Sequence, residues 1–335
     1  MSECPGFDYL IVVPRLRIQN ANAISSPLTH GFPSITAFLG LMWALERKTA
    51  AAGLDICFNA VGVVCHDYEE QITDDSFVKA FRLTRNPIDK DGGTAAIVEE
   101  GRIHLDISLV FAVTSDALAA AEQAGPAAKE AIAAQVRDIL GQMRVAGGSV
   151  VPSRAPLARQ KAYVVQMGGD ATDRQETFSR EMLKLLPGFA LIERSDLLEA
   201  RHQAMLAQNP GSTRLDAWLS LSRINWHYTA PVEGDDKDKG GWTHDRKGLG
   251  WVVPIPVGYG VLSGPHSAGS VANARDASVP FCFVESLYSV GQWLSPHRLQ
   301  SPEQLLWYAN SQPQDGLYRC RNDYRVPQMY AYDAD

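Results

Sequence analysis

Apolar and polar positions divide the first 152 residues into strands and helices in a recognisable order. A continuous apolar run, Leu10–Val13, is typical of a strand buried on both faces. Ser34 can cap a helix and Gly53 can end it, because the apolar residues between them recur at helical spacing. Residues 54–65, rich in Val and Ile, predict a second strand. The apolar positions of the predicted helix are Ile35, Phe38, Leu39, Met42 and Leu45.

The clearest strand signal is residues 103–113, where apolar residues occupy every second position from Ile103 to Val113. Between this strand and the second one lie residues 67–102, which hold acids, a proline and the turn sequence Asp91-Gly92-Gly93. We expect them to form a long hairpin or loop that projects from the sheet. Pro126 marks the start of another helix, and a glycine turn within 144–152 leads into a short strand.

This order, strand–helix–strand–strand–helix–strand with a long insertion, is that of a ferredoxin-like (RRM-like) βαββαβ domain. We therefore predict an α+β fold in which residues 1–152 form the ferredoxin-like core, including the insertion 67–102. RRM modules bind RNA on this scaffold, but many unrelated functions share it, so the order alone does not fix function.

Residues 153–335 give a weaker pattern and predict an irregular C-terminal α/β extension packed on the core. Residues 163–167 favour a strand, and Thr172 with Gln175 predicts a capping box before a helix stopped by Pro187-Gly188. Another helix is expected from Ser195. We expect the charged, glycine-rich residues 231–247 to be a mobile loop. The proline-broken residues 251–257 are suited to an edge strand or to packing across a neighbouring element.

Composition narrows the class of protein. The 335 residues are 45% hydrophobic and 21% charged, with a formal net charge of −7, which argues against a free-standing, non-specific nucleic-acid binder. No apolar stretch approaches the roughly 18 residues of a membrane span, and the N-terminus is unlike a signal peptide. The five cysteines show no CxxC spacing and are expected to be reduced thiols. We expect a cytoplasmic protein without membrane contact.

Hydrogen-bond donors without any acid follow the first strand. Arg15, Arg17, Gln19, Asn20 and Asn22 come at once, and further on Ser25, Ser26, Thr29 and His30 add to them. A buried strand that leads into such a loop is suited to an anionic, polar ligand. The alternative is a surface loop whose polar groups are solvated.

Two further clusters combine arginine with polar or glycine residues. The projecting segment carries Arg82, Arg85 and Asn86, and the end of the second helix leads into Arg144, Gly147, Gly148, Ser149 and Arg154. Glycine lets backbone N–H groups approach a phosphate, and arginine adds charge-assisted hydrogen bonds. Three such clusters on one ferredoxin-like scaffold predict an RNA-binding path.

Motifs for metal or cofactor chemistry are weak. No HxxxH or HExxH spacing follows Cys65-His66, and Gly147-Gly148-Ser149 lacks the Gly-Lys-Ser/Thr of a P-loop, so we expect neither metal nor cofactor. A metal-independent ribonuclease needs only a general base and acid, which histidine can supply. His30 is the one histidine that invites this hypothesis; the alternative is a histidine hydrogen-bonded in the fold.

Sequence blocks in nearly the whole chain are similar to one family. The chain resembles the second Csy subunit, the Cas-five-type subunit of type I-F CRISPR surveillance (Cascade-like) complexes. The blocks that carry the resemblance, in chain order, are Pro14–Pro33, Leu83–Pro87, Gly93–Arg102, Met143–Ser149, Leu186–Leu191, Trp251–Tyr259, Asn273–Asp276, Trp293–Arg298 and Gly316–Arg319.

The resemblance implies a non-catalytic subunit of a ribonucleoprotein that defends against foreign DNA. Such a subunit holds the 5′ handle of the CRISPR RNA together with the large first Csy subunit (Cas-eight-type), next to the Cas-seven-type backbone subunit and with target DNA near the complex tail. Residues 67–102 would be its β-hairpin thumb. The handle contacts we predict are Arg15, Arg17, Asn20, Asn22, His30, Arg82, Arg85, Asn86, Arg144, Gly147, Gly148, Ser149 and Arg154.

The sequence departs from the wider repeat-associated superfamily in one respect, since the usual long glycine-rich loop near the C-terminus is not evident. Two alternatives stay open. One is a metal-independent endoribonuclease that processes CRISPR repeat RNA, with His30 as base. The other is an adaptor that touches only protein partners.

Overall fold

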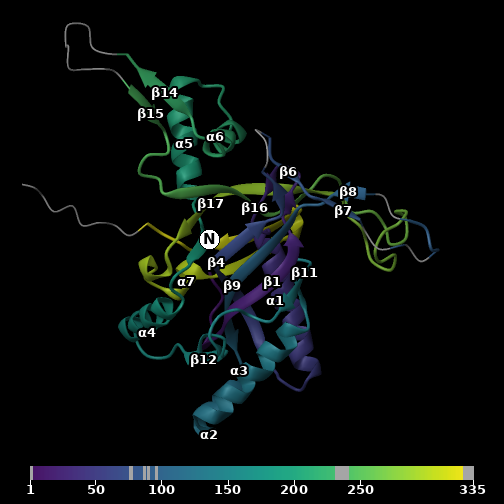
Figure 1. The fold of residues 1–335 in the computed structure, drawn as a ribbon, viewed down its shortest axis with the longest axis vertical. Helices are drawn as coiled ribbons and strands as arrows, with labels where there is room; N and C mark the ends of the chain where they lie inside the picture. The colour runs from purple at the N-terminus through teal and green to yellow at the C-terminus, as the bar shows by residue number, and fades with distance from the viewer. Residues whose placement is uncertain are drawn as a thin grey trace, which may run out of the picture.

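The computed structural model describes residues 3–74, 78–85, 88, 91–94, 97–230 and 241–326. These residues form a mixed α/β structure with seven α-helices and one eleven-stranded antiparallel sheet (Figure 1). The predicted contact Asn86 lies outside the described residues, as do residues 231–240 of the expected mobile loop.

The first half is built on four strands: β1 (Tyr9–Asn22), β4 (Cys57–Glu70), β9 (Arg102–Thr114) and β12 (Tyr163–Gln166). They lie side by side in the order β12–β1–β9–β4. Helix α1 (Ile35–Ala51) connects β1 to β4, and α2 (Asp116–Ala124) and α3 (Pro126–Gly141) lie between β9 and β12. Strands β1, β4 and β9 and helices α1 and α3 confirm the sequence pattern, whereas α2 was not predicted. The short strand predicted within 144–152 is β11 (Gly148–Val151), which also pairs with β1, and β12 is the separate strand expected at 163–167.

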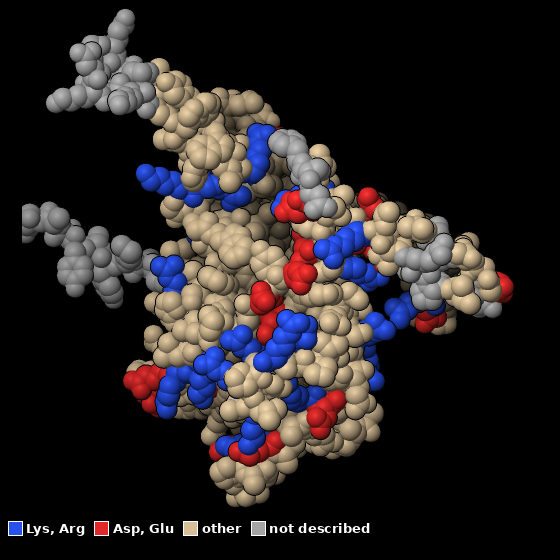
Figure 2. Space-filling view, in the orientation of Figure 1, with Lys and Arg blue, Asp and Glu red and all other residues tan. Residues whose placement is uncertain are grey.

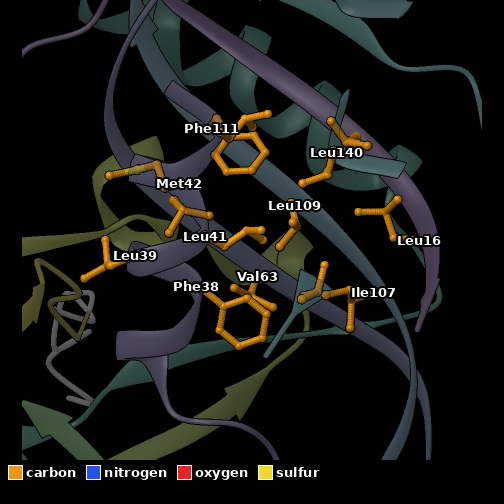
Figure 3. Close-up of a cluster of buried hydrophobic side chains, with 14 of the residues drawn as sticks. Leu16, Phe38, Leu39, Leu41, Met42, Val63, Ile107, Leu109, Phe111 and Leu140 are labelled. Atoms are coloured by element: carbon orange, nitrogen blue, oxygen red, sulfur yellow. The ribbon is translucent and has the colours of Figure 1, made fainter. Parts of the chain in front are cut away.

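Two helices cover one face of this sheet and bury the main core. The Ser34 hydroxyl accepts a hydrogen bond from the backbone N–H of Thr36 and so caps α1, as predicted. Figure 3 shows apolar side chains of α1 and α3 gathered over those of the strands. A buried side chain of this size contributes about 2 kcal/mol. The helix residues labelled there are Phe38, Leu39, Leu41, Met42 and Leu140, and the strand residues are Leu16, Val63, Ile107, Leu109 and Phe111.

The second half extends the same sheet and closes a ring of six strands. From β4 the pairing runs through β13 (Phe189–Glu193), β17 (Val284–Leu294), β16 (Trp251–Val261), β19 (Leu317–Asn322) and β18 (Trp307–Gln312). Strand β18 then pairs back with β4, Trp307 opposite Val61. The Trp307 indole is fully buried and donates a 2.8 Å hydrogen bond to the Leu191 carbonyl across the ring. This half is therefore more regular than its sequence pattern predicts.

Smaller elements surround the sheet. Helix α4 (Ala171–Lys184) lies near β12, and α5 (Ser195–Gln208), α6 (Arg214–Leu221) and a two-stranded ribbon lie at the end of the molecule opposite α2 and α3 (Figure 1). The ribbon consists of β14 (Trp226–Thr229) and β15 (Gly241–His244). The remaining elements are β2 (Ile24–Ser26), β3 (Thr29–His30), β10 (Arg144–Val145), β11 (Gly148–Val151) and α7 (Pro302–Leu305).

The projecting segment is shorter than the predicted 67–102, because β4 continues to Glu70 and β9 begins at Arg102. It holds two small antiparallel ladders, seen on the right of Figure 1. One pairs β5 (Ile72–Thr73) with β6 (Ala80–Phe81), and the other pairs β7 (Leu83–Arg85) with β8 (Ile97–Glu99).

Three local expectations are wrong. Residues 14–22 continue strand β1 instead of forming a loop, and residues 241–244 form β15. The cap of α4 is Asp170, whose carboxylate accepts from the Thr172 and Asp173 N–H groups, because an acceptor two residues earlier fits this helix start better. In β16, by contrast, residues 251–256 pair with β17 alone and so form the expected edge, which accommodates the two prolines, while residues 258–260 also pair with β19.

None of the helices in the described part of the chain is long and apolar enough to cross a membrane.

Candidate nucleic-acid interface

Two of the predicted donor clusters meet in a cleft of about 530 Å³ beside the edge of the sheet, here called the edge cleft. Asn22 from the end of β1 and Ser25 from β2 line one side of it. Arg144 and Gly147 from the β10–β11 hairpin line another. Among the lining residues that the structure describes, Arg144 is the one with a charge, and none is an acid.

The β10–β11 hairpin owes its shape to its two turn residues. Ala146 has φ +47° and Gly147 has φ +81°, the pair of positive values that a type I′ turn requires. The Asn22 N–H donates a 2.9 Å hydrogen bond to the Ala146 carbonyl, and the Arg144 guanidinium donates one of 3.3 Å to the Gly147 carbonyl. The turn is thereby tied to the end of β1, and Arg144 is held over it with its side chain exposed.

Gly148 and Ser149 have different places. A Cβ atom on Gly148 would lie 2.7 Å from the Ala21 nitrogen, so glycine there permits close approach of β11 to β1. Ser149 pairs with Gln19 on β1 and is exposed. Neither lines the edge cleft.

The rest of the edge cleft comes from residues that the sequence did not single out. The first turn of α1 contributes Ser34 and Thr36, and helix N-termini favour anions because their N–H groups lack intrahelical partners. The far wall is Tyr259 of β16 and Tyr318 of β19, stacked with 6.3 Å between ring centroids and 22° between planes. Burial raises the pKa of Tyr318 well above its ordinary value, so its hydroxyl stays protonated.

Arg15 and Arg17 lie away from this cleft, on the face of the sheet opposite α1 and α3. Strand β1 has two bulges there, and the residues in them, Arg15 (φ +54°) and Asn20 (φ +56°), adopt left-handed backbone conformations. Bulges of this kind re-aim side chains out of the strand alternation. Arg17 lies opposite Asp106 of β9. Burial raises the pKa of the Asp106 carboxyl, and the charges of Arg15 and Arg17 oppose this only in part.

A hydrogen-bonded chain fixes the first bulge. The Arg15 N–H donates to the fully buried Ser108 hydroxyl at 3.1 Å. Ser108 Oγ lies 2.6 Å from His66 Nε2, and His66 Nδ1 lies 2.7 Å from the Pro187 carbonyl, so His66 donates to Pro187 and accepts from Ser108. Burial lowers the pKa of His66 to about 4, which keeps the ring neutral as this arrangement requires.

The predicted contacts on the projecting segment and after β11 lie apart from the edge cleft and from the bulge at Arg15. The Arg82 side chain bonds the Gln71 side chain at 3.0 Å and the Ile72 carbonyl at 3.3 Å, within the segment itself. Arg85 belongs to β7, and Arg154 is exposed in the stretch that follows β11. The twelve predicted contacts within the described residues therefore do not form one site.

His30 lines a second, larger cleft of about 640 Å³ between the two halves of the chain, here called the aromatic cleft. Its Nδ1 lies 2.8 Å from the Glu70 carboxylate, and its ring meets Phe81 edge-on at 5.7 Å. The aromatic cleft is lined by Phe32, Tyr68, Phe189, Trp218, Leu219, Trp251 and Trp293, among other residues.

Charges on the surface are mixed. On the face in Figure 2 the basic side chains lie in small groups, several next to acidic ones, rather than in one continuous patch. Within the described part of the chain, no group of three or more His, Cys, Asp and Glu residues is placed to hold a metal ion. A site with donors, aromatic walls and one arginine can bind a polar anion by hydrogen bonds and stacking, as RNA-binding surfaces do.

Comparison with known proteins identifies the class. The family described as "CRISPR-associated protein (Cas_Csy2)" matches residues 11–320. The CRISPR-associated protein Csy2 of Pseudomonas aeruginosa (strain UCBPP-PA14) is 45% identical over 318 residues, which cover 92% of this chain and 94% of that protein. The chain therefore belongs to the Csy2 family of CRISPR-associated proteins. This confirms the resemblance to the second Csy subunit of type I-F systems.

Proposed function

We propose that this subunit of the type I-F Csy complex holds the 5′ handle of the CRISPR RNA, and that the edge cleft is a principal RNA contact. The observation that carries the proposal is the make-up of the edge cleft, in which Arg144, the turn at Gly147, Asn22 and the first turn of α1 surround a space without any acid. Phosphate fits such a set, and Tyr259 and Tyr318 offer ring surfaces to a base or sugar.

The topology supports assignment to the ferredoxin-like, Cas-five-type subunits. In the order β12–β1–β9–β4, each strand–helix–strand unit is split by a strand of the other unit, which is the ferredoxin-like arrangement. Segment 71–101 then corresponds to the thumb. We propose residues 1–152 as the RNA-binding core, to whose sheet β12 is added by pairing with β1, and 153–335 as the unit that closes it.

We propose for this subunit the neighbours that the resemblance implies. Its partners would be the large first Csy subunit (Cas-eight-type), the Cas-seven-type backbone subunit and target DNA near the tail of the complex, in the cytoplasm. Its role is to hold RNA rather than cleave it. His30, the candidate base of the alternative ribonuclease, faces Glu70 in the aromatic cleft and does not line the edge cleft. Arg15, Arg17, Arg82, Arg85 and Arg154 stay candidates for further RNA contacts.

The test is to co-express the chain with its complex partners and a repeat-containing RNA, and to compare wild type with Arg144→Gln. We expect about tenfold weaker handle binding and a salt dependence shallower by about one unit, as loss of one phosphate contact requires. Arg159→Gln, an exposed arginine outside both clefts, is the matched control. An Arg144→Gln complex with wild-type affinity and salt slope would remove the edge cleft from the RNA path.

A further inference from the structure

The aromatic cleft differs from the edge cleft in the charge of its lining. Among the described residues that line it are two carboxylates, Asp67 and Glu70, and no lysine or arginine. Of its two histidines, His66 is held neutral by burial, and His30 is already bonded to Glu70. The two clefts are neighbours, since Ser25, Pro33 and Ser34 line both.

The walls of the aromatic cleft are preformed yet open to solvent. Trp218 is 4% exposed and its indole N–H donates to the Ser289 carbonyl at 2.9 Å, so this wall is fixed by packing and a hydrogen bond. The Trp293 ring packs against the Trp251 ring, with 6.1 Å between ring centroids. By contrast Trp251 is 48% exposed, Phe189 45% and Leu219 47%. Large aromatic side chains exposed in one concave place mark a binding surface rather than ordinary surface.

We propose that the aromatic cleft receives an apolar anchor side chain of another protein subunit, carried on a segment with lysine or arginine beside the anchor. The volume of about 640 Å³ has room for a large side chain together with neighbouring residues of its segment, and anchors in such pockets dominate protein interfaces. Asp67 and Glu70 supply the complementary charge for the basic flank. The proposal stands whether or not the edge cleft holds RNA.

The same charges argue against other occupants. A nucleic acid would bring phosphates to two carboxylates with no cation in the lining to neutralise them. The chain's own C-terminal residues, which end Tyr332-Asp333-Ala334-Asp335, carry the same sign of charge as the cleft. A basic, apolar protein segment is the occupant that both the walls and the charges fit.

The test places a photo-reactive benzoylphenylalanine at position 219, in the subunit assembled with its full complex, and identifies the cross-linked partner by mass spectrometry. We expect one peptide from a different protein subunit, with an aliphatic or aromatic residue at the cross-link and Lys or Arg within a few residues. The control is the same probe at position 183 of α4, where Leu183 is 57% exposed and outside both clefts; it should not give that peptide. Cross-links to RNA, to a second copy, to the chain itself or to nothing would each overturn the proposal.

A substitution gives a second readout. Leu219→Arg places a cation in the cleft and should weaken capture of the cross-linked subunit at least tenfold, while Leu183→Arg leaves it unchanged. If Leu219→Arg does not fold, Leu28→Arg is used instead, because Leu28 also lines the aromatic cleft and is 61% exposed. Wild-type capture by a folded variant would refute the assignment. Failure of this test with a positive Arg144→Gln result would leave the RNA proposal intact.

Discussion

Gly40 allows the edge cleft to be closed without damage to the fold. It lies on α1, is exposed, and lines the edge cleft. A Cβ atom built on it meets nothing within 4 Å, and its φ is not in the left-handed region. Gly40→Ala should therefore stabilise the protein by about 0.5–1 kcal/mol, because glycine is the poorer residue in a helix interior.

Gly40→Glu adds a carboxylate to a cleft whose one charge is Arg144. A carboxylate at position 40 and a phosphate bound in the cleft, taken as two unit charges about 8 Å apart, would repel each other by about 2 kcal/mol at an effective dielectric constant of about 20. RNA binding should accordingly fall by about 1–2 kcal/mol, or roughly 5- to 30-fold. Gly40→Gln, which has the same shape without the charge, separates electrostatic repulsion from steric blockage.

The assay is a salt-controlled filter-binding titration of CRISPR RNA with the co-purified complex, beside denaturant unfolding of each variant. We expect Ala, Gln and Glu variants all to be at least as stable as wild type, and RNA affinity to fall in the order Ala, Gln, Glu. Equal affinity of the Glu and Gln variants would refute the idea that an anion occupies this cleft. Lower stability of the Ala variant would refute the reading of Gly40 as unconstrained.

Two predictions concern the scaffold. The pKa of His66 is about 4 in the folded chain and about 6.5 in the unfolded chain, so folding favours the neutral ring. The contribution of His66 to the free energy of unfolding is present above pH 6.5 and is lost as the pH falls towards 4. At pH 5 the protein should be less stable by about 2 kcal/mol. An NMR titration that places the pKa of His66 near 6.5 would contradict it. Gly258→Ala should destabilise the fold by about 3 kcal/mol or more, since a Cβ there would lie 2.0 Å from the Tyr318 carbonyl oxygen. The control is Gly264→Ala, which has open space around it and should leave the free energy of unfolding unchanged in denaturant unfolding.

Local signals predicted the elements that depend on local interactions. The cap at Ser34 and the apolar stripe after it predicted α1 to within a few residues, and the alternation from Ile103 predicted β9. The Asp170 cap was missed because Thr172 with Gln175 satisfies the same pattern two residues later. The prolines of β16 correctly indicated that residues 251–257 lie at an edge, but they gave no signal of the second neighbour at residues 258–260.

The candidate site was predicted only in part. Asn22, Arg144 and Gly147 were named from their chemistry, and the structure brings them to one cleft. Tyr259 and Tyr318 were missed, because they reach the cleft through pairing of strands far away in sequence. Arg15 was expected in a loop beside Asn22, but it lies in a bulge on the opposite sheet face. The division at residue 152 stays a prediction.

The ring closed by β18 on β4 has a consequence for synthesis of the chain. The edge of β4 is formed by residues 57–70, but its last partner, Trp307, leaves the ribosome about 240 residues later. Strand β13 pairs with residues 64 and 65 of this edge earlier, but until Trp307 is made the part around Val61 is open to pairing with other chains, which is a common route to aggregation. Long-range closure of this kind is slow. The edge cleft, which needs Tyr318, likewise exists only in a nearly complete chain. Truncated products of translation would therefore lack that cleft, and their open edge would expose them to quality control.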